Sequence, residues 1–346
     1  MQSIPFSFED VEGAQQKLRG VARRTPLVES LDMGFAGSLH LKTENLQLTH
    51  AFKFRGAYNR VTSLTSAERD RGLIAASSGN HALGLSLAGA ITDSKVTVVM
   101  PEGAPEVKAA GCRAYGADVL RRGETYDDAL AFATDLASEE GYTYVQSFDD
   151  PIVAAGQATA TWEIVEDIPD LEVLVLPIGG GGLATGALGF LRTAPDQLFA
   201  ERTAPLREVK VVGVQAEGAA SMVASVGRGE RLALSEISTI ADGIAVKEPG
   251  RMTFEAVAST IDELVTVSDE EMLRAVALLA TREKLVVEPA GAAAVAAVLG
   301  GRGETIGFAS SKGSRVVCIL SGGNLESDVL LDALQLEETE KEGECS

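Results

Sequence analysis

Two regularities of the chain predict an α/β architecture in which helices cover both faces of parallel sheets. Short runs rich in β-branched residues recur along the 346 residues, and an Ala- and Leu-rich stretch with helical character follows each of them. Such alternation is typical of parallel sheets, whose strands are buried on both faces. The length accommodates one large or two moderate domains, and an apolar share of 45% is sufficient for a substantial core.

The expected strands follow one another along most of the chain, at residues 39–42, 73–76, 96–100, 119–121, 143–146, 173–178, 211–215, 264–267 and 316–320. Amphipathic segments lie between them, for example residues 126–139 and 271–284. Three helix starts carry a capping box, in which two side chains satisfy backbone amides of the first turn. These pairs are Ser7 with Asp10, Thr125 with Asp128, and Ser268 with Glu271.

Charge and composition favour a soluble cytoplasmic protein. A formal charge of −20 repels polyanions, so nucleic acid is not an expected partner. Residues 1–10 lack the pattern of a secretory signal, and the Ala-rich run 290–299 is too short to cross a bilayer, so no membrane association is expected. Cys112, Cys318 and Cys345 are far apart and show no metal-ligand spacing, which fits a reducing compartment without disulfides.

The first candidate site is the segment Thr-His-Ala-Phe-Lys-Phe-Arg-Gly-Ala at residues 49–57, which places Lys53 between two phenylalanines before a helical pattern. Such a lysine either lays its stem on apolar neighbours with the amine in water, or holds its amine partly desolvated. Desolvation disfavours the ammonium form and increases the fraction of free base that attacks an aldehyde.

The loop Ser-Ser-Gly-Asn-His at residues 77–81 lies between the expected strand 73–76 and a helix. Unpaired amides at a helix N-terminus attract anions, so the loop is a candidate seat for a substrate carboxylate, with Asn80 or Ser78 reaching the reacting group. A simple Asn or Ser helix cap explains the same residues. His81 alone carries little functional signal.

The most specific feature is the tetraglycine that follows the buried strand 173–178 and opens a helix. Consecutive glycines let the backbone approach a ligand closely and direct several amides at one phosphate. The Gly-Lys-Ser/Thr ending of a P-loop is missing. A looser dinucleotide pattern fits Gly179, Gly181 and Ala184. No acidic residue stands about 20 positions on at the end of a second strand, however, since Glu217 comes much later.

A fourth loop, Ser-Gly-Gly-Asn at residues 321–324, follows the buried strand 316–320. The carboxyl ends of parallel strands open onto one crevice, so this loop and the tetraglycine are expected to meet there. Ser321 is then placed to face a ring nitrogen of a ligand. Without the other motifs it is an ordinary turn.

These motifs, in this order, resemble the fold-type II pyridoxal-phosphate enzymes, and among them the threonine/serine dehydratase (ammonia-lyase) and serine racemase family. The resemblance extends from Arg-Thr-Pro-Leu at 24–27 to Asn324, and includes Lys-Thr-Glu-Asn-Leu-Gln at 42–47, Ala-Asp-Gly-Ile-Ala-Val at 241–246 and Val-Glu-Pro-Ala-Gly-Ala at 287–292. Synthase-like relatives usually carry Asp-Arg after the lysine. Phe54 and Arg55 stand there, which favours the dehydratase branch.

The resemblance implies a role for each motif. Lys53 would carry pyridoxal 5′-phosphate and remove the Cα proton of the substrate, while Phe52 would flank the ring. Asn80 would bind the ring hydroxyl and Ser321 the pyridine nitrogen, where a serine does not enforce protonation and so favours prompt elimination. The phosphate would be held by Gly179, Gly180, Gly181 and Gly182, and the substrate carboxylate by Ser77, Ser78, Gly79, Asn80 and His81.

The resemblance also implies the organisation of the chain. Two open sheets of parallel type with helices on both faces are expected, as in the β-subunit of tryptophan synthase. Residues 1–67 and 149–335 would form a large cofactor-binding domain, residues 68–148 a small mobile domain, and residues 336–346 an acidic solvated tail. A homodimer is expected. Feedback regulation is not, because no regulatory domain follows Asn324.

Three positions depart from the family pattern. His50 replaces a small residue, often glycine, and is expected to reshape the pocket entrance or contact a substrate side chain. Ser78 stands where many dehydratases have alanine, whereas racemases have a serine that protonates the opposite face. The racemase metal site falls near Glu217, Ser221 and Val223, where an acidic residue is missing at Val223, so no metal is expected.

The expected activity is therefore an ammonia-lyase that converts L-threonine, L-serine or 3-hydroxyaspartate into a 2-oxo acid and ammonium. A racemase using Lys53 and Ser78 is the nearest alternative. A nucleotide-dependent oxidoreductase, suggested by the glycine pattern, and a non-catalytic binding protein are more distant ones. The low-polarity setting of Lys53 argues against a mere binder, which does not need a buried amine.

Overall fold

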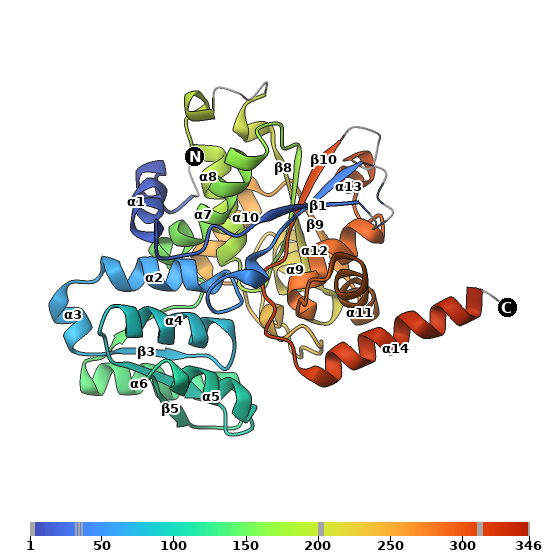
Figure 1. The fold of residues 1–346 in the computed structure, drawn as a ribbon. Helices are drawn as coiled ribbons and strands as arrows, with labels where there is room; N and C mark the ends of the chain where they lie inside the picture. Colours follow the sequence, from blue (N-terminus) through green and yellow to red (C-terminus); the bar gives the residue numbers. More distant parts are fainter. Residues whose placement is uncertain are drawn as a thin grey trace.

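Two sheets organise the chain in a computed structural model that describes residues 4–344 except 32, 34, 36, 200–203 and 310–313. Within these residues, the larger sheet has the strand order β1-β2-β10-β7-β8-β9 and the smaller one β5-β4-β3-β6 (Figure 1). The strands are β1 (Leu27–Ser30), β2 (Ser38–Lys42), β3 (Leu73–Ala76), β4 (Val96–Met100), β5 (Asp118–Arg121), β6 (Thr143–Tyr144), β7 (Val173–Pro177), β8 (Lys210–Ala216), β9 (Glu263–Val267) and β10 (Arg315–Ile319). The predicted α/β class is confirmed.

Parallel pairing sets the positions of the glycine loops. All neighbouring strands of the described sheets run parallel except β1, which pairs antiparallel with β2 at the edge. Strands β7 and β10 are direct neighbours, with Val173 opposite Val316 and Val175 opposite Cys318. The tetraglycine and the Ser-Gly-Gly-Asn loop therefore leave adjacent strands at the same edge of the sheet, as predicted.

The helices that surround the sheets are α1 (Phe8–Leu18), α2 (Lys53–Ser63), α3 (Ser66–Asp70), α4 (Asn80–Ile91), α5 (Glu106–Ala114), α6 (Tyr126–Glu140), α7 (Pro151–Asp167), α8 (Gly182–Thr193), α9 (Ser221–Arg228), α10 (Arg251–Thr260), α11 (Asp269–Leu278), α12 (Pro289–Leu299), α13 (Glu304–Ala309) and α14 (Ser327–Glu344). The three predicted capping boxes are present, and Thr65 with Glu68 forms another at α3. None of the helices in the described residues is both long and apolar enough to span a bilayer.

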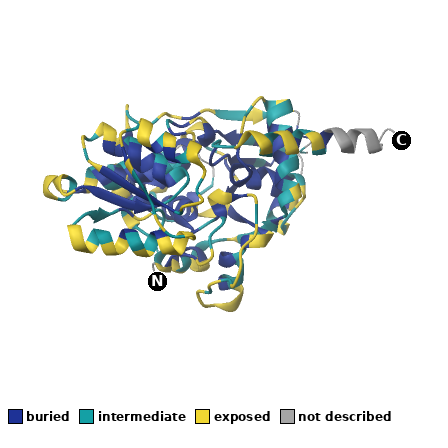
Figure 2. Ribbon diagram, turned by 90° about the horizontal axis from the view of Figure 1, so that it is seen from below, coloured by how far each residue is buried: buried dark blue, intermediate teal, exposed yellow. Residues whose placement is uncertain are grey.

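Alternate residues of the central strands face opposite layers. Val173 and Val175 of β7 belong to the core formed with α11 and α12, whereas Leu174 and Leu176 belong to the core formed with α7 and α8. Figure 2 shows strands coloured as buried, flanked by helices whose outer faces are exposed. This double burial explains why the strands read as continuous apolar runs.

Helix α2 lies between the two sheets. It packs against α4 on the side of the small sheet and against α7 on the side of the large sheet (Figure 1). Phe54 is fully buried in the core of the small sheet. The helix that begins at Lys53 is therefore held by both halves of the molecule.

The structure differs from the sequence prediction in three details. Strand β1 was missed because it is a short edge strand with no fully buried residue. The helix expected at 271–284 begins at Asp269 and ends in a turn of π-helix at Leu279–Glu283. Residues 336–344 of the expected acidic solvated tail are helical and continue α14 to Glu344, and the first part of that helix packs on α11. Residues 345–346 lie outside the described part.

The cysteines that the structure describes are free thiols. Cys112 and Cys318 are both buried, and Cys345 lies outside the described residues. Burial raises the pKa of both buried thiols above the ordinary value. They act as small apolar residues of the core, as expected for chains without disulfides.

Candidate functional site

Lys53 is the first residue of α2, and its amine is enclosed. Its Nζ donates a hydrogen bond to the carbonyl of Ser147 at 2.9 Å. It also lies 5.4 Å from the ring centroid of Phe52 and 6.0 Å from that of Phe148. Burial lowers the pKa of Lys53 from 10.5 to about 8. About one amine in ten is therefore free base at pH 7, compared with about one in a few thousand for an ordinary lysine, and the free base is the form that attacks an aldehyde.

The second aromatic ring beside Lys53 is not the one expected from the sequence. Phe54 turns into the core of the small sheet, where its ring lies 5.6 Å from that of Tyr58. Phe148 takes its place, from the loop between β6 and α7. Because the partners of Lys53 lie almost 100 residues further along the chain, no local pattern identifies them.

Phe148 also joins the lysine to the tetraglycine. A Cβ atom built on Gly180 would lie 2.5 Å from the Phe148 ring, and one on Gly182 would lie 3.0 Å from the Phe148 Cα. The predicted amine and the predicted phosphate loop thus contact the same side chain. The structure brings these two motifs together.

The tetraglycine has no room for side chains. A Cβ on Gly179 would lie 3.0 Å from the Cα of Ile244, and one on Gly181 would lie 2.7 Å from the Cβ of Thr253. Gly181 also has a φ of +99°, which glycine adopts without strain. Glycine is required here because the turn that ends at Ile244 and the first turn of α10, which contains Thr253, pack directly onto this backbone.

The Ser-Ser-Gly-Asn-His loop lies beside the start of α2. It connects β3 to α4, and a Cβ on Gly84 of α4 would lie 3.1 Å from the backbone nitrogen of Phe54. Ser77, Ser78, Gly79 and Asn80 are partly buried, and no side chain caps the start of α4. The alternative of a simple side-chain helix cap does not hold.

The His81 imidazole forms a hydrogen bond to the backbone inside the fold. Its Nε2 lies 3.1 Å from the carbonyl of Val145, so this nitrogen carries the proton. Burial, together with the charge on Lys53, lowers the pKa of His81 to about 3. The imidazole is neutral at physiological pH, and it ties α4 to the segment after β6.

Two side chains, those of Glu288 and Asn324, hold the Asn80 amide by hydrogen bonds. Its Nδ2 donates to Oε1 of Glu288 at 2.7 Å, and its Oδ1 accepts from Nδ2 of Asn324 at 2.7 Å. Asn324 belongs to the fourth glycine loop, whereas Glu288 was not proposed as a site residue. The signal was the Val-Glu-Pro-Ala-Gly-Ala motif, in which a glutamate precedes the buried helix α12.

Glu288 is buried, and none of the ion pairs among the described residues includes it. Its carboxyl group therefore has a raised pKa. Desolvation raises its pKa from 4.5 to about 7, although the hydrogen bond from Asn80 opposes this change. The native state therefore binds a proton that the unfolded state releases between about pH 4.5 and 7. Glu288 thus contributes stability at low pH that is lost as the pH rises through 7.

Replacing Glu288 with glutamine is expected to remove this pH dependence. In the cofactor-free protein, Glu288→Gln should match the parent near pH 4.5 and exceed its unfolding free energy at pH 8 by roughly 2–3 kcal/mol, because no charge is buried. Urea unfolding at both pH values measures the difference. An equal effect of the substitution at both pH values would contradict the buried carboxylate.

The Ser-Gly-Gly-Asn loop contacts the lysine segment through its backbone. The carbonyl of Ser321 accepts a hydrogen bond from the amide of Phe52 at 3.0 Å, and Ser321 is 4% exposed. Gly322 forms a bridge to Ala51. The residue expected to face a ring nitrogen is therefore adjacent to the residue expected to flank the ring.

The His50 backbone explains why a small residue is common at this position. His50 has a φ of +56°, in the left-handed region, and its carbonyl accepts the amide of Gly323 at 2.8 Å. The side chain is exposed. The position thus links the lysine segment to the fourth loop through its backbone, with a conformation that favours glycine.

Replacing His50 with glycine is expected to stabilise the protein. The left-handed conformation costs an L-residue about 1–2 kcal/mol, and the greater freedom of glycine in the unfolded chain offsets part of that gain. A gain of up to about 1 kcal/mol in unfolding free energy should appear in urea titrations. Gln16→Gly, at an exposed position of α1, is the control and should destabilise.

Two of the residues at the positions of the racemase metal site, Ser221 and Val223, form hydrogen bonds within the protein. The Ser221 hydroxyl donates to the carbonyl of Val246 at 2.7 Å, and the amide of Val223 donates to Gln215 Oε1 at 2.9 Å. In the described residues, no group of three or more His, Cys, Asp or Glu side chains is arranged to hold a metal ion.

The site residues fit pyridoxal phosphate, which combines an aldehyde, a phosphate ester and a planar ring. Lys53 offers an amine of lowered pKa, and the tetraglycine offers amides in a backbone that carries no side chains of its own. Thr185, in the first turn of α8, is fully buried, and its hydroxyl has no hydrogen-bond partner among the described residues. A ligand oxygen at the tetraglycine would satisfy such a group.

Comparison with known proteins agrees with this chemistry. The family described as "Pyridoxal-phosphate dependent enzyme" matches residues 18–322. An L-threonine ammonia-lyase of Thermotoga maritima is 42% identical over 327 residues, which are 94% of this chain and 77% of that protein. The processed form of threonine deaminase isoform 2 from Solanum lycopersicum has a TM-score of 0.86 at 33% identity, over 96% of this chain and 88% of that one. A serine racemase of Dictyostelium discoideum has a TM-score of 0.82 at 31% identity, over 94% and 100% of the two chains.

Proposed function

Since this chain belongs to the family of pyridoxal-phosphate dependent enzymes, we propose that it is an ammonia-lyase that converts a small β-hydroxy amino acid into a 2-oxo acid and ammonium. One observation carries the proposal. The Lys53 amine, with a pKa of about 8, and the tetraglycine lie beside the same residue, Phe148. The names of the relatives favour L-threonine as the substrate, and L-serine and 3-hydroxyaspartate are the further candidates.

The residues of the chain have distinct tasks in this reaction. When bound, the cofactor supplies an electron-withdrawing ring that stabilises negative charge at the substrate Cα. Lys53 binds the cofactor and later removes the Cα proton at its Nζ. Phe52 would flank the ring, Asn80 would bind the ring hydroxyl and Ser321 would bind the ring nitrogen. Gly179, Gly180, Gly181 and Gly182 hold the phosphate.

The substrate is held by the loop between β3 and α4. Backbone amides at the start of α4 bind its carboxylate, with Ser77, Ser78, Gly79, Asn80 and His81 forming the seat. The absence of a side-chain cap at this start supports the role, because the first amides of the helix stay available to a ligand. Loss of the Cα proton and the β-hydroxyl removes one water, and hydrolysis of the dehydrated product yields the 2-oxo acid and ammonium.

A panel of β-hydroxy amino acids tests the proposal. The holoenzyme is incubated with all stereoisomers of threonine, serine and 3-hydroxyaspartate. The amounts of 2-oxo acid and ammonium are then measured. We expect turnover of L-threonine or one of the other two L-substrates, with the two products formed in equal amounts. Release of neither product from any of them contradicts the proposal.

A second candidate function is amino-acid racemisation, with Ser78 as the acid or base opposite Lys53. Its support is the partly buried Ser78 on a loop that packs beside α2, together with the similarity to a serine racemase. Chiral analysis of recovered L-serine measures it. Ser78→Ala is expected to suppress racemisation while leaving elimination, and racemisation that survives this change excludes Ser78 from the role.

We also propose the organisation that goes with this function. Residues 1–67 and 149–335 form the large domain and residues 68–148 the small mobile one, supported by the position of β3, β4, β5 and β6 within 68–148. Residues 336–346 form an acidic end that starts within α14. The enzyme acts as a homodimer in the cytoplasm, and sedimentation of the holoenzyme tests the dimer.

A further inference from the structure

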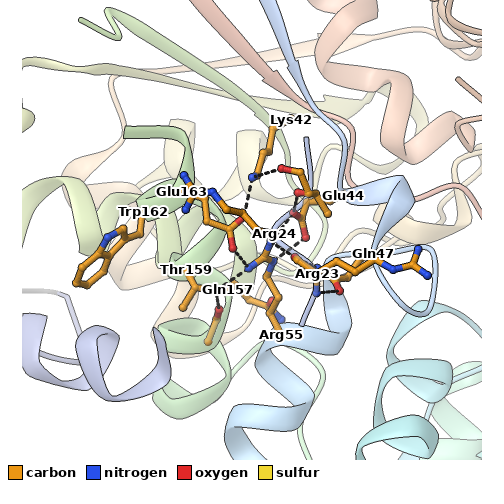
Figure 3. Close-up of polar contacts among 12 residues, drawn as sticks. Arg23, Arg24, Lys42, Glu44, Gln47, Arg55, Gln157, Thr159, Trp162 and Glu163 are labelled. Atoms are coloured by element: carbon orange, nitrogen blue, oxygen red, sulfur yellow. Dashed lines mark hydrogen bonds and ion pairs between the residues drawn. The ribbon is translucent and has the colours of Figure 1, made fainter. Parts of the chain in front are cut away.

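A buried cluster of charges lies behind the start of α2 and takes no part in the chemistry described above. The Arg55 cluster consists of Lys42, Glu44, Arg55 and Glu163 (Figure 3). The side chains of Lys42 and Glu44 are 0% exposed, that of Arg55 1% and that of Glu163 7%. Two cations and two anions balance in charge. Arg55 follows Lys53 by two residues.

Two carboxylates clamp the Arg55 guanidinium. Glu44 accepts from Nε and Nη2, each at 2.8 Å. Glu163 accepts from Nη1 at 2.7 Å and from Nη2 at 2.8 Å, and the Thr159 hydroxyl lies 3.2 Å from Nη1. These carboxylates raise the pKa of Arg55, and in turn Arg55 lowers the pKa of Glu44 against the effect of burial. Bidentate pairs of this kind fix orientation as well as distance.

Stability alone is a weak explanation for such a cluster. Four charges are removed from water, and buried ion pairs are often no more stabilising than apolar residues of the same volume. A cluster of this kind does, however, impose one geometry on the segments that carry its members. The parts of the site that the Arg55 cluster positions can therefore be found from the segments that it joins.

Each segment joined by the cluster leads to a different part of the site. Arg55 belongs to α2, which carries Lys53. Lys42 ends β2, and its carbonyl accepts the amide of Leu320, the residue before Ser321, at 2.9 Å. Glu163 lies on α7, which begins just after Phe148 and packs against α8 so closely that a Cβ on Gly186 would lie 2.6 Å from the carbonyl of Ala154.

We propose that Arg55 is a positioning residue, whose clamp by Glu44 and Glu163 sets the Lys53 amine relative to Ser321 and the tetraglycine. Lys42 extends the clamp by binding Glu163 Oε2 at 2.6 Å and the carbonyl of Thr25 at 2.8 Å. Loosening the clamp lets the first turn of α2 shift, and the amine then leaves the Ser147 carbonyl and the two aromatic rings. The inference rests on the proposed function only for its kinetic readout.

Three variants separate positioning from general stability. Arg55→Lys keeps the charge but removes the fork. Thr159→Val has nearly the same shape and removes one hydrogen-bond acceptor of Arg55. Arg24→Lys is the matched control, because Arg24 also binds two acidic residues of α7, Glu166 and Asp167, but is half exposed at the far end of that helix.

The first measurement needs no turnover. In the cofactor-free protein, acetylation of Lys53 by acetic anhydride is followed by mass spectrometry across pH. The parent and Arg24→Lys are expected to show a midpoint near 8. His81, the titratable group whose charge would act on Lys53, stays neutral over this range. In Arg55→Lys the midpoint should move toward 10.5, because the displaced amine regains water.

The second measurement is steady-state kinetics of the holoenzyme, per cofactor-bound site and well below the melting temperature. A displacement on the order of 1 Å lowers kcat by about 10- to 100-fold in Arg55→Lys, with KM within about twofold. Thr159→Val should lower kcat by about threefold, because one hydrogen bond of the clamp is lost.

The outcomes distinguish the ideas. If Arg55→Lys and Thr159→Val lower only the melting temperature, while the Lys53 midpoint and kcat stay at parental values, the cluster is merely structural and the inference is overturned. If Arg55→Lys does not fold, Thr159→Val decides the question by the same two readouts. If the parent turns over none of the amino acids, the proposed function fails, but the acetylation midpoints still test the inference.

Discussion

Replacing Lys53 with alanine is expected to abolish elimination, by about 10⁴-fold or more, because in the proposed function the amine both binds the cofactor and moves the Cα proton. The visible absorption band of the lysine-bound cofactor should disappear with it. The fold should survive, since Lys53 makes one side-chain hydrogen bond, to the Ser147 carbonyl, and the loss is within about 1 kcal/mol. Activity assays, absorption spectra and urea unfolding measure the three effects.

The control for this substitution is Lys17→Ala. Lys17 is an exposed lysine of α1 that binds the Ser63 hydroxyl at 2.7 Å, far from the cofactor loops in the sequence. The absorption band and activity of this variant should match the parent. An active, coloured Lys53→Ala protein would falsify the assignment of the base.

Replacing Gly181 with alanine is expected to weaken cofactor binding by about 100-fold, or about 2.7 kcal/mol. The new Cβ would lie 2.7 Å from that of Thr253, at a φ of +99° that alanine rarely adopts. Thr253 is not free to move, because its hydroxyl donates to the Gly180 carbonyl at 2.5 Å. The loop must therefore shift, and the amides aimed at the phosphate shift with it.

Titration of the cofactor-free Gly181→Ala protein with pyridoxal 5′-phosphate measures the loss of affinity. A parallel titration with pyridoxal shows whether the loss arises at the phosphate group. Affinity for pyridoxal, which lacks the phosphate, should change far less. Gly13→Ala is the control, since Gly13 lies in α1 with nothing within 4 Å of the place its new methyl group would take, and the change should stabilise the helix by about 0.5–1 kcal/mol. Equal losses for both ligands would place the damage outside the phosphate seat.

The parallel sheets were readable from local sequence because their strands are buried on both faces. Runs such as Val96–Met100 contain no exposed residue and therefore show as unbroken apolar segments. Strand β1 was not readable, because an edge strand with partly exposed side chains has no such pattern. The helical extent of α14 was also missed. Only the first turns of this helix pack on α11, so its later turns show little apolar periodicity.

The motifs of the site were readable where backbone geometry restricts residue type. Glycine is required at 179–182 because atoms of neighbouring segments lie within contact of every Cβ position, and this requirement leaves a mark on the sequence itself. Glu288 and Phe148 left no comparable mark. A glutamate before a proline or a phenylalanine in a loop has many ordinary explanations, and their importance comes from partners distant in the chain.

The order of residues alone predicted the parallel sheets and the glycine loops, because strand burial and close backbone approach act on each segment separately, and the order of the motifs carried the family resemblance. The lowered pKa of Lys53, the ring that encloses it and the acid that binds Asn80 became visible only in the folded chain. Desolvation and hydrogen bonding depend on which distant segments meet, and that is a property of packing rather than of any one stretch of residues.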